Sequence, residues 1–98
     1  MQFTHEEAGR SGRFTLTEAG NTAELSYTVR PETRTLAFDH TFVPAAARGQ
    51  GLARKIVDHA VEHARQAGMK IAPHCSYVSV LFDRNPTLYG DVDARKAR

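Results

Sequence analysis

The chain has 98 residues, of which 41% are hydrophobic and 24% are charged, with 13 Lys and Arg residues against 11 Asp and Glu residues. These values are typical of one small globular domain, and the net charge of +2 argues against nucleic acid as the main partner. No apolar run reaches the roughly 18 residues of a membrane span, the polar N-terminus does not resemble a signal peptide, and one cysteine cannot form an internal disulfide. We therefore expect a cytoplasmic protein without membrane contact, with a single domain over residues 1–98, its core at about 12–90 and a basic, solvated tail at 91–98.

Three strands are predicted in the first half of the chain. Apolar and polar residues alternate over 13–19 and 22–30, and Gly20-Asn21 between them predicts a hairpin. A third strand follows over 33–43. One face of this third strand carries Leu36, Phe38, His40 and Phe42. The short connections favour an antiparallel meander of these three strands.

The hydrophobic period changes after Gln50. Apolar residues recur at helical spacing over 52–64, and Gly68 ends this helix. A fourth strand is predicted over 69–78, and a short helix over 79–85. The order β-β-β-α-β-α makes the long helix a right-handed crossover between parallel strands, which predicts an α+β fold with a mixed, mostly antiparallel sheet.

The start of the long helix has the composition of an anion site. Backbone N–H groups at a helix start lack partners and carry partial positive charge, so anions bind there readily. Gly49 and Gly51 allow a phosphate to approach these groups closely, and Arg48 adds a fixed charge. The same glycines also fit a tight turn that only connects strand to helix, and spacing alone does not separate the two interpretations.

Two other phosphate-binding loops fit the sequence less well. The P-loop motif G-x-x-x-x-G-K-[ST] is absent. The dinucleotide motif G-x-G-x-x-G begins with Gly49 and Gly51 but has Arg54 in its third glycine position. No acidic residue ends a strand about 20 residues later to bind a ribose. Neither motif therefore defines the ligand of this helix start.

The segment RGQGLA at 48–53 resembles the R/Q-x-x-G-x-G/A motif of the GNAT superfamily of N-acetyltransferases. Together with HTFVP at 40–44, CSYV at 75–78 and RNP at 84–86, it is similar to a branch of single short acetyltransferase-like domains. The resemblance extends over about residues 12–90. It implies a GNAT-like sheet, acetyl-CoA as co-substrate, and transfer of an acetyl group to a primary amine.

The resemblance also implies roles for individual residues. By this resemblance the end of the third strand, Phe42 and Val43, pairs with the pantetheine arm, Cys75 lies beside the thiol end of the cofactor, and Asn85 lines it. The pyrophosphate loop is matched by Arg48, Gly49, Gln50, Gly51, Leu52 and Ala53. These assignments place one ligand along the third strand and the start of the long helix.

The sequence departs from the superfamily in one respect. Typical members have one or two helices between their first two strands, and these helices help to form the acceptor site. Here only Gly20-Asn21 separates the predicted strands. The acceptor site is therefore open to an amine on a larger molecule, or completed by another subunit of an oligomer, or too incomplete for efficient transfer.

Few side chains are candidates for the chemistry. Cys75 is a nucleophile, an acid for the leaving thiolate, or simply a small buried residue. His40 is a general base or a hydrogen-bonded core histidine. Tyr77 and Tyr89 can donate a proton or only pack. His74 is a poor base for Cys75, because neighbours in a strand point to opposite faces.

The sequence also allows three other interpretations. His59 and His63 are one helical turn apart, but no third ligand is apparent, so we expect no metal. A non-catalytic acyl-CoA-binding or interaction module would explain the missing substrate helices. A nucleic-acid-associated module would depend on Arg95, Lys96 and Arg98.

Overall fold

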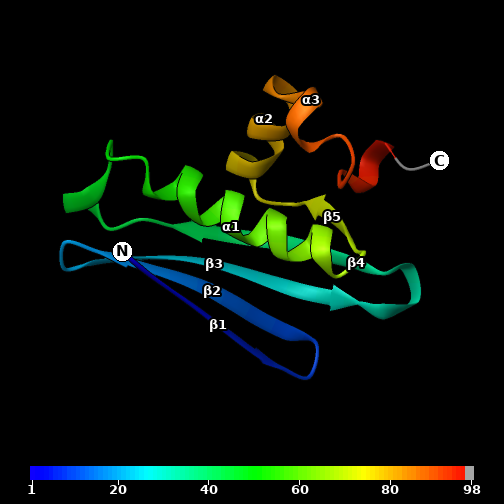
Figure 1. The fold of residues 1–98 in the computed structure, drawn as a ribbon, viewed down its shortest axis with the longest axis horizontal. Helices are drawn as coiled ribbons and strands as arrows, with labels where there is room; N and C mark the ends of the chain where they lie inside the picture. The colour runs from blue at the N-terminus through cyan, green and yellow to red at the C-terminus, as the bar shows by residue number, and fades with distance from the viewer. Residues whose placement is uncertain (97–98) are drawn as a thin grey trace.

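The computed structural model describes residues 1–96, and its five strands form one sheet in the order β1-β2-β3-β4-β5 (Figure 1). The strands are β1 Gln2–Ala8, β2 Ser11–Glu18, β3 Asn21–Arg30, β4 Thr35–Phe42 and β5 Lys70–Pro73. The first three pairings are antiparallel, and only β4 and β5 are parallel. The predicted α+β class, with a mixed, mostly antiparallel sheet, is confirmed.

Three α-helices follow the antiparallel part of the sheet. They are α1 Leu52–Gln66, α2 Ser76–Arg84 and α3 Pro86–Tyr89, and short 3-10 segments occur at η1 Pro31–Thr33, η2 Ala45–Ala47 and η3 Ala94–Lys96. Within residues 1–96, no helix combines the length and the apolar character needed to cross a membrane. As predicted, α1 is the crossover between the parallel strands β4 and β5.

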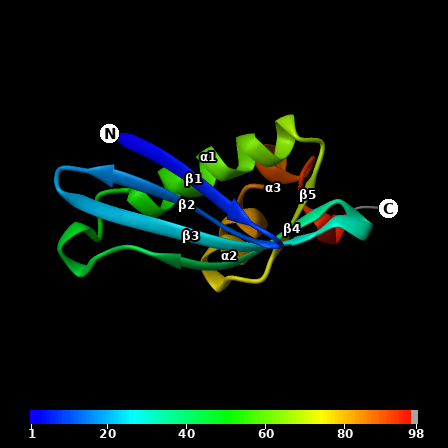
Figure 2. The same ribbon diagram turned by 90° about the horizontal axis from the view of Figure 1, so that it is seen from below.

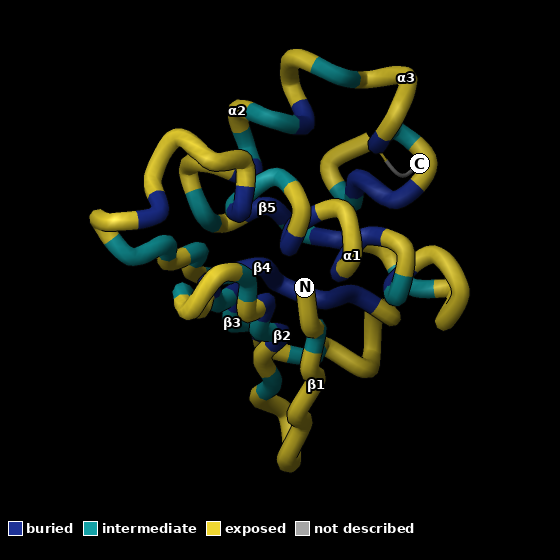
Figure 3. Tube along the Cα trace, turned by 60° about the vertical axis from the view of Figure 1, so that its left-hand side comes forward, coloured by how far each residue is buried: buried dark blue, intermediate teal, exposed yellow. Residues whose placement is uncertain are grey.

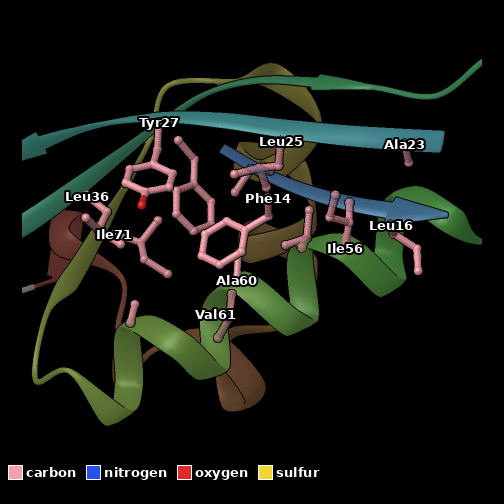
Figure 4. Packing of buried hydrophobic residues seen from close by; sticks show 14 of the residues in the cluster. Phe14, Leu16, Ala23, Leu25, Tyr27, Leu36, Ile56, Ala60, Val61 and Ile71 are labelled. Carbon is pink, nitrogen blue, oxygen red and sulfur yellow. The ribbon is translucent and has the colours of Figure 1, made fainter. Parts of the chain in front are cut away.

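Helix α1 covers one face of the sheet (Figures 1 and 2). Its apolar side packs onto Phe14, Leu25 and Tyr27 of β2 and β3, whose side chains point toward the helix (Figure 4). The buried residues of α1 are Leu52, Ile56, Val57, Ala60, Val61 and Ala64. These residues recur every three or four positions, which is why the period predicted this helix correctly.

The sequence did not predict the first strand. The segment QFTHEEA has no apolar alternation, and β1 is largely exposed (Figure 3). Only Phe3 of this strand is partly buried. The strand forms because its backbone pairs with β2 from Gln2↔Thr17 to Ala8↔Ser11. The side chains of Phe3 and His5 on β1 also stack on His59 and Phe14, so the strand is held both by its ladder and by these ring contacts.

Two-residue turns join the first three strands, so no helix interrupts them, as predicted. The β2–β3 turn is Ala19-Gly20, one residue earlier than the predicted Gly20-Asn21. Both turn residues have positive φ, 52° for Ala19 and 80° for Gly20. These angles define a type I′ turn, whose right-handed twist matches that of the strands, and the turn holds Ala19 in a conformation that costs energy for alanine.

The fourth predicted strand, 69–78, is too long. Strand β5 ends at Pro73, and Cys75 is the residue before α2. The segment CSYV is therefore a helix start, and the predicted helix over 79–85 begins earlier, at Ser76. The strand stops because Pro73 limits the ladder and the chain turns after it, with the His74 N–H donating to the Ala72 carbonyl.

The C-terminal segment is not a solvated tail as far as the structure describes it. Val92 and Asp93 are each only 2% exposed, and the Ile71 N–H donates to the Val92 carbonyl. Arg95 forms ion pairs with both Asp93 and Asp83. Residues 92–93 thus pair with the side of β5 that faces away from β4. Of the basic residues predicted for this tail, Arg98 lies outside the described residues.

A cluster of imidazoles joins β1 to α1. His5 stacks on Phe14 at a ring-centroid distance of 4.1 Å and contacts the edge of His63 at 4.6 Å, while His59 stacks on Phe3. The structure thus brings a third imidazole to His59 and His63. Within residues 1–96, however, no group of three or more potential ligands has an arrangement that could hold a metal.

Replacing Ala19 by Asn is expected to stabilise the protein, because Asn tolerates positive φ and Asn-Gly is the preferred type I′ turn. We expect a gain of about 0.5 kcal/mol, which raises the Tm by roughly 2–4 °C in a domain of this size. The matched variant Ala19→Val should lower the Tm, because a β-branched residue fits positive φ poorly. Thermal unfolding by circular dichroism measures both, and equal Tm values for the two variants would contradict this account of the turn.

The imidazole cluster predicts a loss of stability in mild acid. Burial and the neighbouring His63 lower the pKa of His5, against a smaller opposing effect of Glu7, and burial and His63 also lower the pKa of His59. Their folded-state pKa values thus lie below the unfolded value of about 6.5. The unfolded state binds more protons as the pH falls through this range, so the Tm should drop between about pH 7 and pH 5.

Replacing His63 by Gln tests the cause of this drop. The variant removes one charge from the cluster, so its Tm should fall less between pH 7 and pH 5 than that of the wild type. His40→Gln, on the opposite face of the sheet, should follow the wild type. A fall of the same size in the His63→Gln variant would show that the cluster is not its source.

Candidate functional site

The loop before α1 has the backbone conformation that the sequence suggested. Gly49 and Gly51 have φ values of 86° and 80°, and Gly51 is the residue immediately before the helix. A Cβ at either position would meet no atom within 4 Å. The glycines are therefore required by backbone conformation and not by crowding, and the space in front of them is open.

The backbone donors of this loop have no partners in the protein. The Arg48 N–H donates to the Ala45 carbonyl, and the Lys55 N–H donates to the Gly51 carbonyl. Between them, none of the N–H groups of residues 49–54 donates to another group within residues 1–96. These donors lie at the positive end of a 15-residue helix, which is the arrangement that binds an anion.

A hollow of about 240 Å³ opens beside these donors. It lies where the end of β4, the loop before α1 and the start of α2 meet. Its walls are formed by Val43, Ala47, Arg48, Gly49, Gly51, Leu52, Ala53, Arg54 and Tyr77. The structure therefore brings the predicted loop residues together with Val43, although Gln50 and the 56%-exposed Phe42 are not part of the walls.

Strand β4 offers a free edge near this hollow. Its pairing with β5 ends at Phe38↔Pro73, whereas its pairing with β3 continues to Phe42. The register with β3 shifts next to Phe38, which leaves Asp39 as an extra, bulged residue. Residues 39–42 thus have a neighbouring strand on one side only, and their other edge faces the diverging chain that leads into α2.

Cys75 lies on this diverging chain. It is half-buried, its N–H donates to the Phe38 carbonyl, and its Sγ is 3.6 Å from the Thr41 hydroxyl oxygen. Burial raises the pKa of the thiol, but the nearby Val78 backbone N–H, the Thr41 hydroxyl and the Tyr77 backbone N–H lower it by more. The pKa of Cys75 therefore falls below its ordinary value, as expected for a cysteine at a helix N-terminus.

The other predicted site residues lie away from the hollow. The bulge at Asp39 turns His40 to the face opposite Phe38, so the predicted shared face is wrong and His40 is exposed. Asn85 lies at the far end of α2, where its amide donates to the Leu81 carbonyl. Neither side chain is part of the walls of the hollow.

His74 does not contact the thiol of its neighbour. Its Nδ1 lies 3.7 Å from the Asp39 carboxylate, and its Nε2 faces the Arg30 guanidinium at 3.4 Å. The reason differs from the predicted one, because residues 74–75 are not in a strand. The conclusion that His74 is poorly placed as a base for Cys75 agrees with these contacts.

Two residues of the site were missed in the sequence. Thr41 contacts Cys75 across 34 positions of the chain, and no local pattern reveals such a pair. Arg54 lines the hollow from the first turn of α1, although the sequence pointed to it only as the residue that breaks the dinucleotide motif. Its partner Asp58, four residues later, was the available signal, since such pairs fix side-chain direction.

Comparison with known proteins agrees with this geometry. The family model of GCN5-related N-acetyltransferases matches residues 13–92, so the chain belongs to this family. The solution structure of a GCN5-like protein from Staphylococcus aureus, proposed to be an N-acetyltransferase, is similar in fold. The two are 27% identical with a TM-score of 0.65, over 92% of this chain and 86% of the other.

The thiol environment yields a direct test. Replacing Thr41 by Val removes a hydrogen bond that lowers the pKa of Cys75, so the pKa should rise and alkylation by iodoacetamide at neutral pH should slow by about 2- to 10-fold. Thr41→Ser keeps the hydroxyl and should react like the wild type. The sequence has a single cysteine, so mass spectrometry reports only this site; equal rates for all three proteins would contradict the assignment.

Proposed function

We propose that this protein is an acetyl-CoA-dependent N-acetyltransferase that transfers the acetyl group to a primary amine. One observation carries the proposal: the N–H groups of residues 49–54 have no partner within residues 1–96 and lie at the positive end of α1. Membership of the GCN5-related N-acetyltransferase family supports it. The proposed protein works as one domain over residues 1–98 in the cytoplasm, where its cysteine stays reduced.

The residues present suit the parts of the proposed co-substrate. In the proposal the N–H groups of Gln50 to Ala53 hold the pyrophosphate, and the open space in front of Gly49 and Gly51 admits its oxygens. In the proposal, backbone groups of Phe42, at the end of β4, and of the following Val43 pair with the amide-containing pantetheine arm, which replaces the Arg48 Nε donor on the Val43 carbonyl. The thioester then points toward Cys75, on the chain between β5 and α2.

The chemistry needs a nucleophile at the thioester carbon and a proton for the leaving thiolate. Either the amine attacks directly, or Cys75 Sγ attacks first and passes the acetyl group to the amine; in each case the C–S bond of the thioester breaks. The lowered pKa of Cys75 favours a role as nucleophile over a role as proton donor to the leaving thiolate. His40 faces the open side of the sheet, so as a base it would act on the incoming amine and not on Cys75.

The first three strands are joined by two-residue turns, and the helices that typically form the acceptor site are absent between them. The face of the sheet beside β4 therefore has no helical wall in this part of the chain. We therefore propose an acceptor amine that is exposed on a larger molecule. The same feature favours the alternative function, a non-catalytic acyl-CoA-binding module. Acetylated product from a panel of amines supports the enzyme, and saturable acetyl-CoA binding without any turnover supports the module.

Calorimetric titration with acetyl-CoA tests the central proposal. Gly51→Ala forces a strained φ and places a methyl group in the open space before the donors, so it should weaken binding by about 10-fold or more. Gly20→Ala is the matched control, because Gly20 also has φ near 80° and open space but lies in the β2–β3 turn. No saturable binding at millimolar acetyl-CoA, or equal losses in both variants, would end the proposal.

Intact-mass spectrometry after mixing with acetyl-CoA separates the roles of Cys75. An acetyl adduct that forms in the wild type, disappears on addition of amine and is absent in Cys75→Ala supports covalent transfer. Product formation at the wild-type rate by Cys75→Ala would rule out any essential role of the thiol.

A further inference from the structure

A buried tyrosine and a carboxylate fix the side chain of Arg54. The Arg54 Nε donates to the Asp58 carboxylate at 3.2 Å, and the guanidinium carbon lies 5.8 Å from the centre of the Tyr89 ring. The Tyr89 hydroxyl donates to the other Asp58 oxygen at 2.6 Å. Tyr89 is only 3% exposed and stacks on Phe82 of α2. The guanidinium is thus positioned by contacts that begin in the core.

Arg54 lies between two hollows. It forms part of the wall of the hollow beside the α1 donors and part of the wall of a second hollow, also about 240 Å³, between α1 and α3. The second hollow is lined by Arg54, Asp58, Val61, Glu62, Arg65, Leu88 and Tyr89. An elongated ligand that leaves the helix start toward α3 therefore passes this guanidinium.

The other cations near the helix start are placed differently. Arg48 is exposed, and its Nε donates to the Val43 carbonyl, which ties the loop to the end of β4. Lys55 pairs with Glu18 of β2. Arg54 uses Nε for Asp58, and none of the hydrogen bonds within residues 1–96 involves its two terminal nitrogens. A cation that is already ordered loses less conformational entropy when it binds a phosphate.

We propose that Arg54 is the phosphate-binding cation of this site and that Asp58 and Tyr89 are its positioning residues. The protein then selects thioesters that carry a diphosphate, and Arg48, despite its place in the motif, mainly holds the loop. This inference rests on the proposed function, since it needs a phosphate-bearing ligand at the α1 donors. It extends that proposal by naming the side chain that makes a phosphate-bearing thioester bind more tightly than a short acyl thioester without phosphates.

The test measures the Kd of acetyl-CoA and of inorganic pyrophosphate for the wild type, Arg54→Gln and Arg48→Gln. Arg54→Gln should weaken binding of both ligands by about 10-fold or more, because it removes charge-assisted hydrogen bonds. It should also reduce the dependence of log Kd on log salt concentration. Arg48→Gln should change either Kd by less than about 3-fold. Circular dichroism confirms that each variant is folded, and Arg54→Lys should recover part of the affinity.

A double-mutant cycle tests the positioning residues. Tyr89→Phe, which leaves every charge in place, should weaken acetyl-CoA binding by about 3-fold in the wild type and have no effect in the Arg54→Gln background, because Tyr89 acts through Asp58 and Arg54. If the wild type binds acetyl-CoA and Arg54→Gln binds it equally well, or if Arg48→Gln causes the larger loss, the inference is overturned while the proposed function stands. If the wild type binds neither ligand, the proposed function itself fails.

Discussion

The site depends on one constraint, the unsatisfied backbone donors where α1 begins. The N–H groups of residues 49–54 have no acceptor among the described residues, and two glycines with positive φ make this backbone path possible. Buried donors of this kind are paired with carbonyls or capping side chains, and exposed ones bind water or a ligand. Here Gly51 provides no capping side chain, and none of the described residues supplies another acceptor. A ligand with anionic oxygens is the partner that this arrangement suits best.

The rest of the fold positions this helix start. The apolar side of α1 packs against β2 and β3, so the helix axis and its first turn are fixed by the core. Strands β4 and β5 diverge after Phe38, and the start of α2 occupies the end of the gap with Cys75. The N-termini of α1 and α2 thus both border the hollow at the end of β4, and both favour negative charge. One holds the proposed diphosphate and the other lowers the pKa of the thiol.

Much of this could be predicted from local sequence patterns. The helical period gave α1, the alternation gave β2 to β4, and the glycine spacing gave the loop, because each of these signals lies within a few residues. Strand β1 was missed because its sequence carries no apolar alternation, and its stability comes from pairing with β2 and from the stacking of Phe3 and His5 on distant rings. The assignment of His40 to the face of Phe38 failed because one bulged residue, Asp39, reverses every later side chain of the strand.

The contacts that set the pKa of Cys75 and the position of Arg54 could not be predicted from local sequence patterns. Thr41 reaches Cys75, and Tyr89 reaches Asp58, across 34 and 31 positions, and only the folded topology brings these pairs together. The structure also changes which of two arginines, Arg48 in the motif or Arg54 just after it, we expect to bind the phosphates. Sequence similarity points to Arg48, whereas the contacts of the folded chain point to Arg54, which is held from the core and borders both hollows.

The most direct measurement is an NMR titration of isotope-labelled protein with acetyl-CoA, following the backbone amide resonances. If the helix-start donors hold the diphosphate, the largest saturable shifts will occur at residues 49–54, with smaller ones along the free edge of β4. If acetyl-CoA binds but the amide resonances of residues 49–54 keep the chemical shifts of the free protein while those of another surface change, the account of the site is contradicted.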